Sequence, residues 1–99
     1  MILARVIGTV VATQKEKSME GLKFLMLQQV NLDGQPAGGF VVAADAVDAG
    51  VGEMVLCATG SSARQTVQTD KRPCDAVVMA IVDHWEVGGQ TKYKKGQDD

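Results

Sequence analysis

Short runs of Val, Ile and Leu, separated by Gly and by polar clusters, are the feature that most restricts how this chain can fold. Runs of this length and residue type are typical of β-strands rather than of helices. The chain has 99 residues, which is the size of one domain. We therefore predict one small all-β domain whose five strands cover residues 2–13, 24–31, 40–44, 53–59 and 76–82.

The breaks between these runs predict particular turns. Asp33-Gly34, followed by Pro36 and the pair Gly38-Gly39, predicts a hairpin turn. Gly8 lies inside the first run, where it predicts a bend or a bulge. Polar composition also predicts two loops, over residues 14–21 and 67–75.

A single helical turn is expected between the third and fourth strands. Asp45 is placed to cap a turn that runs through Ala49. Gly50 and Gly52 then give the backbone the freedom to leave the turn and to enter the next strand at Glu53.

The turn Gly60-Ser61-Ser62 precedes Ala63 and Arg64 and has three interpretations. In the first, its hydroxyls cap a short helical segment over residues 63–65. In the second, a serine is a nucleophile, but the segment lacks the GxSxG spacing and a base nearby in sequence. In the third, the backbone N–H groups and Arg64 bind an anion, which includes a carboxylate of an adjacent subunit. The capped turn is the favoured interpretation.

The run over residues 76–82 is apolar throughout, which predicts a strand that is buried on both faces. In so small a domain the second face needs a cover, and a neighbouring subunit is one candidate. Residues 84–87 are expected to extend this strand. We therefore place a single domain at residues 1–87 and a polar C-terminal tail, mobile or ordered by a partner, at residues 88–99.

Composition excludes several classes of protein. Hydrophobic residues make up 45% of the chain and charged residues 22%, which is typical of a folded domain rather than a disordered one. A net charge of -2 gives no attraction to nucleic acid or to anionic lipid. We expect no signal peptide and no membrane segment. Cys57 and Cys74 lack the spacing of a zinc site or a disulfide framework and are expected to be free thiols.

The sequence does not indicate an enzyme. His84 is the only histidine, and it lies beside an apolar run rather than near a nucleophile. Carboxylates at turns and strand ends more often accept backbone hydrogen bonds than exchange protons with a substrate; these are Asp45, Asp48, Glu53, Asp75 and Asp83. Met26, Met54 and Met79 are expected to pack in the core. We predict no catalytic residue, no cofactor and no metal site.

A small five-stranded barrel also suggests an alternative, an OB-like barrel that binds a small ligand or a nucleic acid. Such a barrel needs a positively charged groove and aromatic stacking platforms. The chain offers Phe24, Phe40, Trp85 and Tyr93, but its net charge is negative.

Taken in order, several segments resemble the EutN/CcmL family of vertex proteins from carboxysomes and other bacterial microcompartments. The resemblance extends from Met1 to Asp83. It begins with Val6, Gly8, Val10 and Ala12-Thr13-Gln14-Lys15, and continues through Leu22-Lys23-Phe24-Leu25 and Gln28. More specific is the acidic, Gly-rich turn over residues 45–55, and most specific are residues 60–64 and 75–83. Asp48 stands where the family commonly has Gly.

The resemblance implies a five-stranded OB-like β-barrel, with one or two short helical turns, that assembles as a cyclic homopentamer. It implies a structural protein of the bacterial cytoplasm, which caps the vertices of a microcompartment shell beside hexameric shell proteins. It further implies that subunit contacts, or positions near the axial pore, include Asp45, Gly50, Gly52, Glu53, Gly60, Ser61, Ser62, Ala63, Arg64 and Asp83. Arg64 is expected to pair with a carboxylate across the interface.

Overall fold

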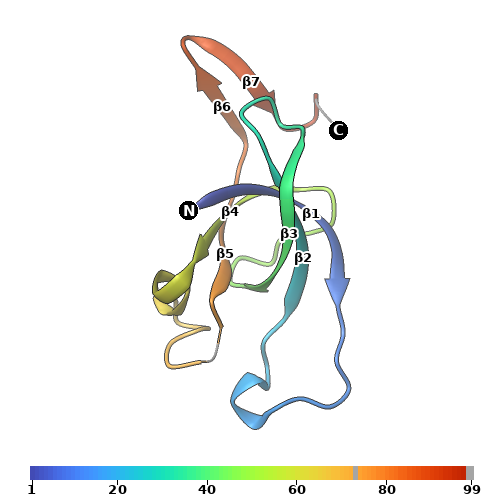
Figure 1. The fold of residues 1–99 in the computed structure, drawn as a ribbon, viewed down its shortest axis with the longest axis vertical. Helices are drawn as coiled ribbons and strands as arrows, with labels where there is room; N and C mark the ends of the chain where they lie inside the picture. The colour runs from blue at the N-terminus through green and yellow to red at the C-terminus, as the bar shows by residue number, and fades with distance from the viewer. Residues whose placement is uncertain (73, 98–99) are drawn as a thin grey trace.

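The computed structural model describes residues 1–72 and 74–97 and shows a closed five-stranded barrel with a separate two-stranded hairpin (Figure 1). The barrel strands are hydrogen-bonded in the order β1-β2-β3-β5-β4, and β6 pairs with β7. Two 3-10 turns, η1 and η2, complete the described elements. Their bounds are β1 Ile2–Val10, η1 Lys17–Met19, β2 Phe24–Val30, β3 Pro36–Asp45, β4 Met54–Thr59, η2 Gly60–Arg64, β5 Ala76–Ile81, β6 His84–Val87 and β7 Gln90–Lys94.

The first strand contains the predicted irregularity at Gly8. β1 pairs with β2 in antiparallel register, and the register shifts between Val6 and Gly8, so that Ile7 is an extra residue in the ladder. A bulge of this kind bends a strand and increases its twist, which helps a short sheet to close. β1 ends at Val10, three residues before the predicted end.

The turn between β2 and β3 is tighter than predicted. The side-chain Oδ1 of Asn31 accepts hydrogen bonds from the backbone N–H groups of Asp33 and Gln35, and Gly34, with φ of +79°, donates to the Asn31 carbonyl at 3.0 Å. β3 therefore begins at Pro36, and the expectation that Pro36 and residues 38–39 belong to the turn is wrong. Proline is compatible with the first position of a strand.

The barrel closes through β5, which pairs in parallel with β3 and antiparallel with β4. Alternate side chains of each strand point inward, as a pleated strand requires. They form a core that excludes water almost completely. Its buried members are Ala4, Val6, Leu25, Leu27, Ala43, Ala49, Val55, Cys57, Ala76 and Val78.

β5 has the buried character that its apolar sequence predicts, but the cover comes from the same chain. Val78 faces the barrel core, whereas Val77 on the other face packs with Ala63 of η2. Both valines are fully buried in the single chain. A neighbouring subunit is therefore not needed to cover the first half of β5. The second half, from Met79 onward, is only half-buried.

Residues 84–97 form a hairpin that extends the molecule to 46 × 23 × 22 Å (Figure 1). The expectation that residues 84–87 extend β5 is wrong, because these residues pair with β7 instead. The expectation of a mobile tail from residue 88 is also wrong for β7. Tyr93 is 1% exposed and packs with Val30 and Met54, so it anchors β7 to the barrel.

Trp85 fixes the hairpin a second time. Its ring stacks on Tyr93 with centroids 4.8 Å apart, and its Nε1 donates a hydrogen bond of 2.7 Å to the Leu32 carbonyl in the β2–β3 turn. An ion pair of 3.3 Å between Lys92 and Asp33 joins the same two segments. The hairpin is thus held against the β2–β3 turn, and Figure 1 shows both segments at the same end of the molecule.

Both cysteines are free, as expected, and both are buried. Burial raises the pKa of the Cys57 thiol, which makes it a poor nucleophile. Met54 lies in the core as predicted, but Met26 and Met79 are only half-buried. In the described part of the chain, no helix is long and apolar enough to span a membrane.

Candidate subunit interface

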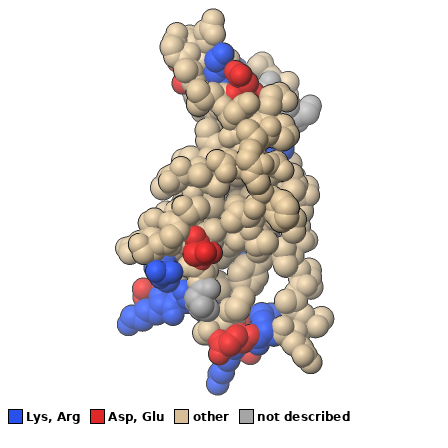
Figure 2. All heavy atoms as spheres, viewed as in Figure 1, with Lys and Arg blue, Asp and Glu red and all other residues tan. Residues whose placement is uncertain are grey.

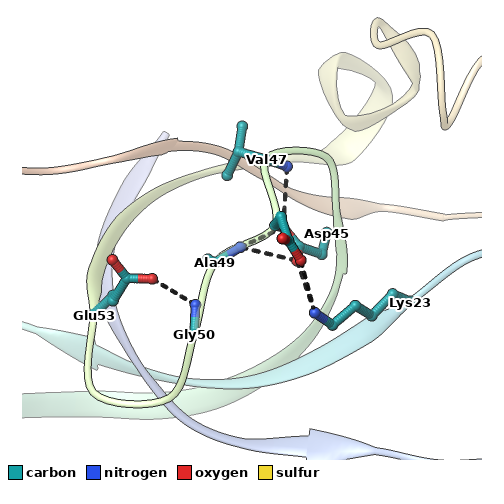
Figure 3. A network of polar contacts seen from close by, with 7 residues as sticks. Lys23, Asp45, Val47, Ala49, Gly50 and Glu53 are labelled. Atoms are coloured by element: carbon teal, nitrogen blue, oxygen red, sulfur yellow. Dashed lines mark hydrogen bonds and ion pairs between the residues drawn. The ribbon is translucent and has the colours of Figure 1, made fainter.

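The segment after β3 closes one end of the barrel through the carboxylate of Asp45 (Figure 3). Its Oδ1 accepts a hydrogen bond of 3.1 Å from the Val47 N–H, and its Oδ2 accepts one of 3.0 Å from the Ala49 N–H. Val47 and Ala49 both pack against the barrel core. The predicted helical turn is absent, because one side chain supplies the acceptors that the turn of a helix would have supplied.

Lys23 lies beside this carboxylate and is shared with a second one. Its Nζ is 3.8 Å from Asp45 and 3.1 Å from Asp48. The Asp45 side chain is 1% exposed and that of Asp48 is 92% exposed. The hydrogen bond that Lys23 donates to Asp48 raises the pKa of Lys23, which stays protonated. Asp48 has φ of +59°, a left-handed conformation that glycine adopts more easily, which explains why glycine suits this position.

Glu53 stabilises the exit from the same segment. Its Oε1 accepts a hydrogen bond of 2.6 Å from the Gly50 N–H, and its other oxygen pairs with Lys95 at 2.8 Å. The Lys95 hydrogen bond and the Gly50 N–H lower the pKa of Glu53. Gly52, with φ of +95°, accepts a bond of 2.7 Å from Arg5. These contacts attach the segment to β1 and to the end of the hairpin.

The Gly60-Ser61-Ser62 turn forms η2, as the capped-turn interpretation expects, but the serines do not cap it. The helix begins after Thr59, where no side chain caps the N-terminus. Instead, Ser62 Oγ donates to the Thr59 carbonyl at 2.9 Å. Ala63 is completely buried against the barrel, and Arg64 is exposed, with one guanidinium nitrogen donating to the Cys74 carbonyl at 3.2 Å.

The structure gathers the candidate residues into two groups. The segment from Asp45 to Glu53 approaches Asp83, because Lys95 pairs with Glu53 and its backbone N–H donates to the Asp83 carbonyl at 2.7 Å. Residues 60–64 lie apart from these positions, on the outside of β4 and β5. The placement of these residues in a subunit contact stays a prediction, as does an Arg64 ion pair across it.

The outside of the barrel has a property that the sequence analysis did not recognise. Antiparallel strands with one face in water usually alternate apolar and polar side chains. Across β1 to β5, all of whose residues are described, only Arg5 and Asp45 carry charge. Arg5 lies over the ring of Tyr93, 5.8 Å from its centroid, and Asp45 is buried in its own turn. The outer wall of the barrel therefore presents no free charge.

Two rows of apolar side chains lie on the outside of the barrel. One row, which we call the β2–β3 wall, contains Met26, Phe40 and Val42, of which Phe40 is 67% exposed. The other, the β4–β5 wall, contains the cross-strand partners Leu3, Leu56 and Ala80, all half-buried. In the closed strand order β2 lies across the barrel from the β4–β5 pair. The near absence of charged residues from these strands was the sequence signal for both walls, and Gln28, the cross-strand partner of Phe40, is polar but uncharged.

Charged side chains gather instead towards the two ends of the molecule (Figure 2). The middle of the face shown in Figure 2 is largely free of Lys, Arg, Asp and Glu. An exposed apolar surface with a polar surround is typical of a protein–protein contact. Because two such walls face different directions on one barrel, the sides of the barrel are its candidate contact surfaces.

Comparison with known proteins identifies the family. The model of the family described as ethanolamine utilisation protein EutN/carboxysome matches residues 1–83, so the chain belongs to the EutN/CcmL family. The carboxysome shell vertex protein CcmL of Gloeobacter violaceus is 50% identical over 96% of this chain and 95% of its own length. Its solved structure covers 96% of this chain and 98% of that one, with a TM-score of 0.91.

A second solved structure is titled as a pentameric microcompartment shell protein, GrpN from Rhodospirillum rubrum. It is 42% identical to this chain, with a TM-score of 0.79, and the match covers 88% of this chain and all of that one. These similarities confirm the predicted family and the predicted all-β barrel.

Proposed function

We propose that this chain is a structural subunit that forms homopentamers at the vertices of a bacterial microcompartment shell in the cytoplasm. A flat hexagonal layer curves and closes only where fivefold units interrupt it, so the function of such a subunit is closure. The proposal is structural rather than catalytic, because the reported relatives are named for their place in a shell.

The observation that carries the proposal is the uncharged outer wall of the barrel. Two apolar walls that face different directions favour a head-to-tail contact, in which the β2–β3 wall of one subunit meets the β4–β5 wall of the next. Repetition of such a contact closes into a ring when the rotation allows it. The exposed Phe40 ring is the natural anchor of this contact, because aromatic side chains dominate interface energetics.

The native mass of the purified chain tests the proposal. Light scattering and native mass spectrometry across a dilution series should give a species of about 53 kDa, five times the 10.5 kDa of the single chain. A monomer or dimer at every concentration would overturn the proposal. It would favour the small binding barrel instead.

A charge placed on the wall provides the matched variant. Phe40→Glu should reduce the pentamer strongly while the monomer stays folded, because a carboxylate in an apolar contact has no partner. Leu32→Glu is the control, since Leu32 is 60% exposed in the β2–β3 turn and outside both walls. A pentamer that is as stable in Phe40→Glu as in Leu32→Glu would show that Phe40 does not lie in the contact.

We extend the proposal to the candidate residues at η2 and to the neighbouring shell proteins. Arg64 is exposed in the single chain, and so its guanidinium is available to a carboxylate of an adjacent subunit. Arg64→Ala should weaken the pentamer by about 2 to 5 kcal/mol if that pair is buried at the contact. An unchanged oligomer would exclude this role.

Hexameric shell proteins are the proposed partners of the assembled pentamer, and pull-down with a hexamer from the same shell tests that step.

A further inference from the structure

The valine that follows η2 is not buried in the single chain. Val67 is 95% exposed, the highest exposure among the large apolar side chains. Its turn is nevertheless well held, because Thr69 is fully buried and its hydroxyl donates to the Ala63 carbonyl at 2.6 Å. A hydrogen bond from the Arg72 guanidinium to the Glu20 carbonyl fixes the end of the loop. Val67 is therefore presented on an ordered turn, which lowers the entropic cost of inserting it into a partner.

An apolar groove of about 350 Å³ lies between the end of β1 and the start of β2. Its lining includes Val10, Val11, Leu22 and Phe24, together with the ammonium-bearing side chain of Lys15. This volume is ample for an aliphatic side chain.

The charges beside the valine and the groove are complementary. Asp70 is exposed and borders the same shallow depression as Val67. Arg64 borders this depression too, but its guanidinium donates a hydrogen bond to the Cys74 carbonyl. Lys15 is exposed and lines the groove. Within the described part of the chain, neither residue forms an ion pair, whereas Lys23, the other lysine of the groove, is already paired with Asp45 and Asp48. Lys15 is thus the cation available to an incoming carboxylate.

The valine and the groove lie on different sides of the barrel. Figure 1 shows η2 and the loop after it on the left of the lower half, and the end of β1 on the right. A protrusion on one side and a recess on the other suit a head-to-tail contact between identical subunits, not a twofold one.

We propose that, in the ring, Val67 of each subunit enters the β1–β2 groove of its neighbour, with Asp70 beside the neighbour's Lys15. This inference rests on the proposed pentamer and names one contact within it. The contact joins the loop after η2, which packs on the outside of β4 and β5 through Ala63, to the groove between β1 and β2.

Disulfide trapping tests the contact. Val67→Cys combined with Val11→Cys changes two exposed positions, and oxidation should give a covalent ladder up to five chains on a non-reducing gel. Val67→Cys alone should give nothing beyond a dimer, and Val67→Cys with Leu32→Cys should give no ladder. The native cysteines are buried, so the oxidised parent chain should remain a single band.

Charge exchange gives an independent readout. Lys15→Glu and Asp70→Lys should each raise the concentration at which half of the pentamer dissociates, by about three- to tenfold. In the double variant this concentration should return to within about twofold of the parent value, because the ion pair is restored with reversed polarity.

The outcomes separate this inference from the proposal on which it rests. A parent chain that is not a pentamer overturns the proposed function. A pentameric parent whose double-cysteine variant forms no ladder, or whose charge exchange fails to restore the oligomer, overturns the Val67 contact and leaves the pentamer in place.

Discussion

The Asp45 carboxylate is the side chain whose removal should damage the single barrel most directly. It accepts hydrogen bonds from the backbone of Val47 and Ala49, and these two residues close one end of the barrel by packing on its core. Asp45→Ala deletes both acceptors and leaves the two N–H groups facing an apolar side chain. Ala49 is 2% exposed, so water cannot easily replace its acceptor.

The structure allows an estimate of the loss. A buried donor that is left unsatisfied costs about 1 to 3 kcal/mol, and the half-buried Val47 donor should lie at the low end of that range. Together the two donors should cost about 2 to 4 kcal/mol. In a domain of this size each kcal/mol lowers Tm by about 4 to 8 °C, so the melting temperature should fall by roughly 8 to 32 °C. Asp45→Asn keeps one acceptor oxygen and should lose about half as much free energy.

Urea unfolding followed by far-UV circular dichroism measures this difference. All variants should be compared at one protein concentration, since association stabilises the folded state by mass action. An unchanged urea dependence of the unfolding free energy would show that the variants unfold from the same structure. A loss below about 0.5 kcal/mol for Asp45→Ala would refute the reasoning, because surface substitutions commonly fall in that range.

Three further predictions follow from the same geometry. Asp48→Gly should be more stable than Asp48→Ala by about 1 kcal/mol in urea unfolding, because both lose the Lys23 pair but only alanine is strained at a φ of +59°; equal stabilities would contradict this. Lys95 and Gly50 lower the pKa of Glu53 below its ordinary value of 4.5, so its stabilisation is present above that value and is lost as the pH falls through the folded-state pKa. Glu53→Gln should therefore flatten the acid side of the stability profile between pH 7 and 3, and an identical profile would exclude Glu53 as its source. Trp85→Ala should cost about 1 to 3 kcal/mol and speed amide hydrogen exchange in β7 more than in β4, because the hairpin loses its stacked ring and its bond to the β2–β3 turn; uniform exchange rates would show that the hairpin is held elsewhere.

The sequence predicts the barrel strands well because their signal is local. Apolar runs and the turn residues beside them place all five barrel strands within a few residues of their observed positions. Gly8 likewise marks the bulge in β1. The helical turn after Asp45 was mispredicted because capping a helix and holding a bend call for the same short acceptor side chain, and only the surrounding packing distinguishes them.

The hairpin was missed for a different reason. Gly88 and Gly89, with Gln and Lys nearby, have the composition of a mobile tail, yet they form the turn between β6 and β7. β7 is stabilised by Tyr93, whose core partners Val30 and Met54 lie far away in sequence. Long-range contacts of that kind leave no local pattern. The uncharged wall, by contrast, does leave a local pattern, because it needs only strands that lack charged residues.

A wall without charge and ends rich in charge should respond to different solution conditions. Apolar contacts weaken on cooling and depend little on ionic strength, whereas contacts between exposed charges are screened by salt within about 10 Å at 0.1 M. Raised salt should therefore weaken the charged contacts at the ends of the molecule first, whereas cooling should first weaken the contact between the apolar walls.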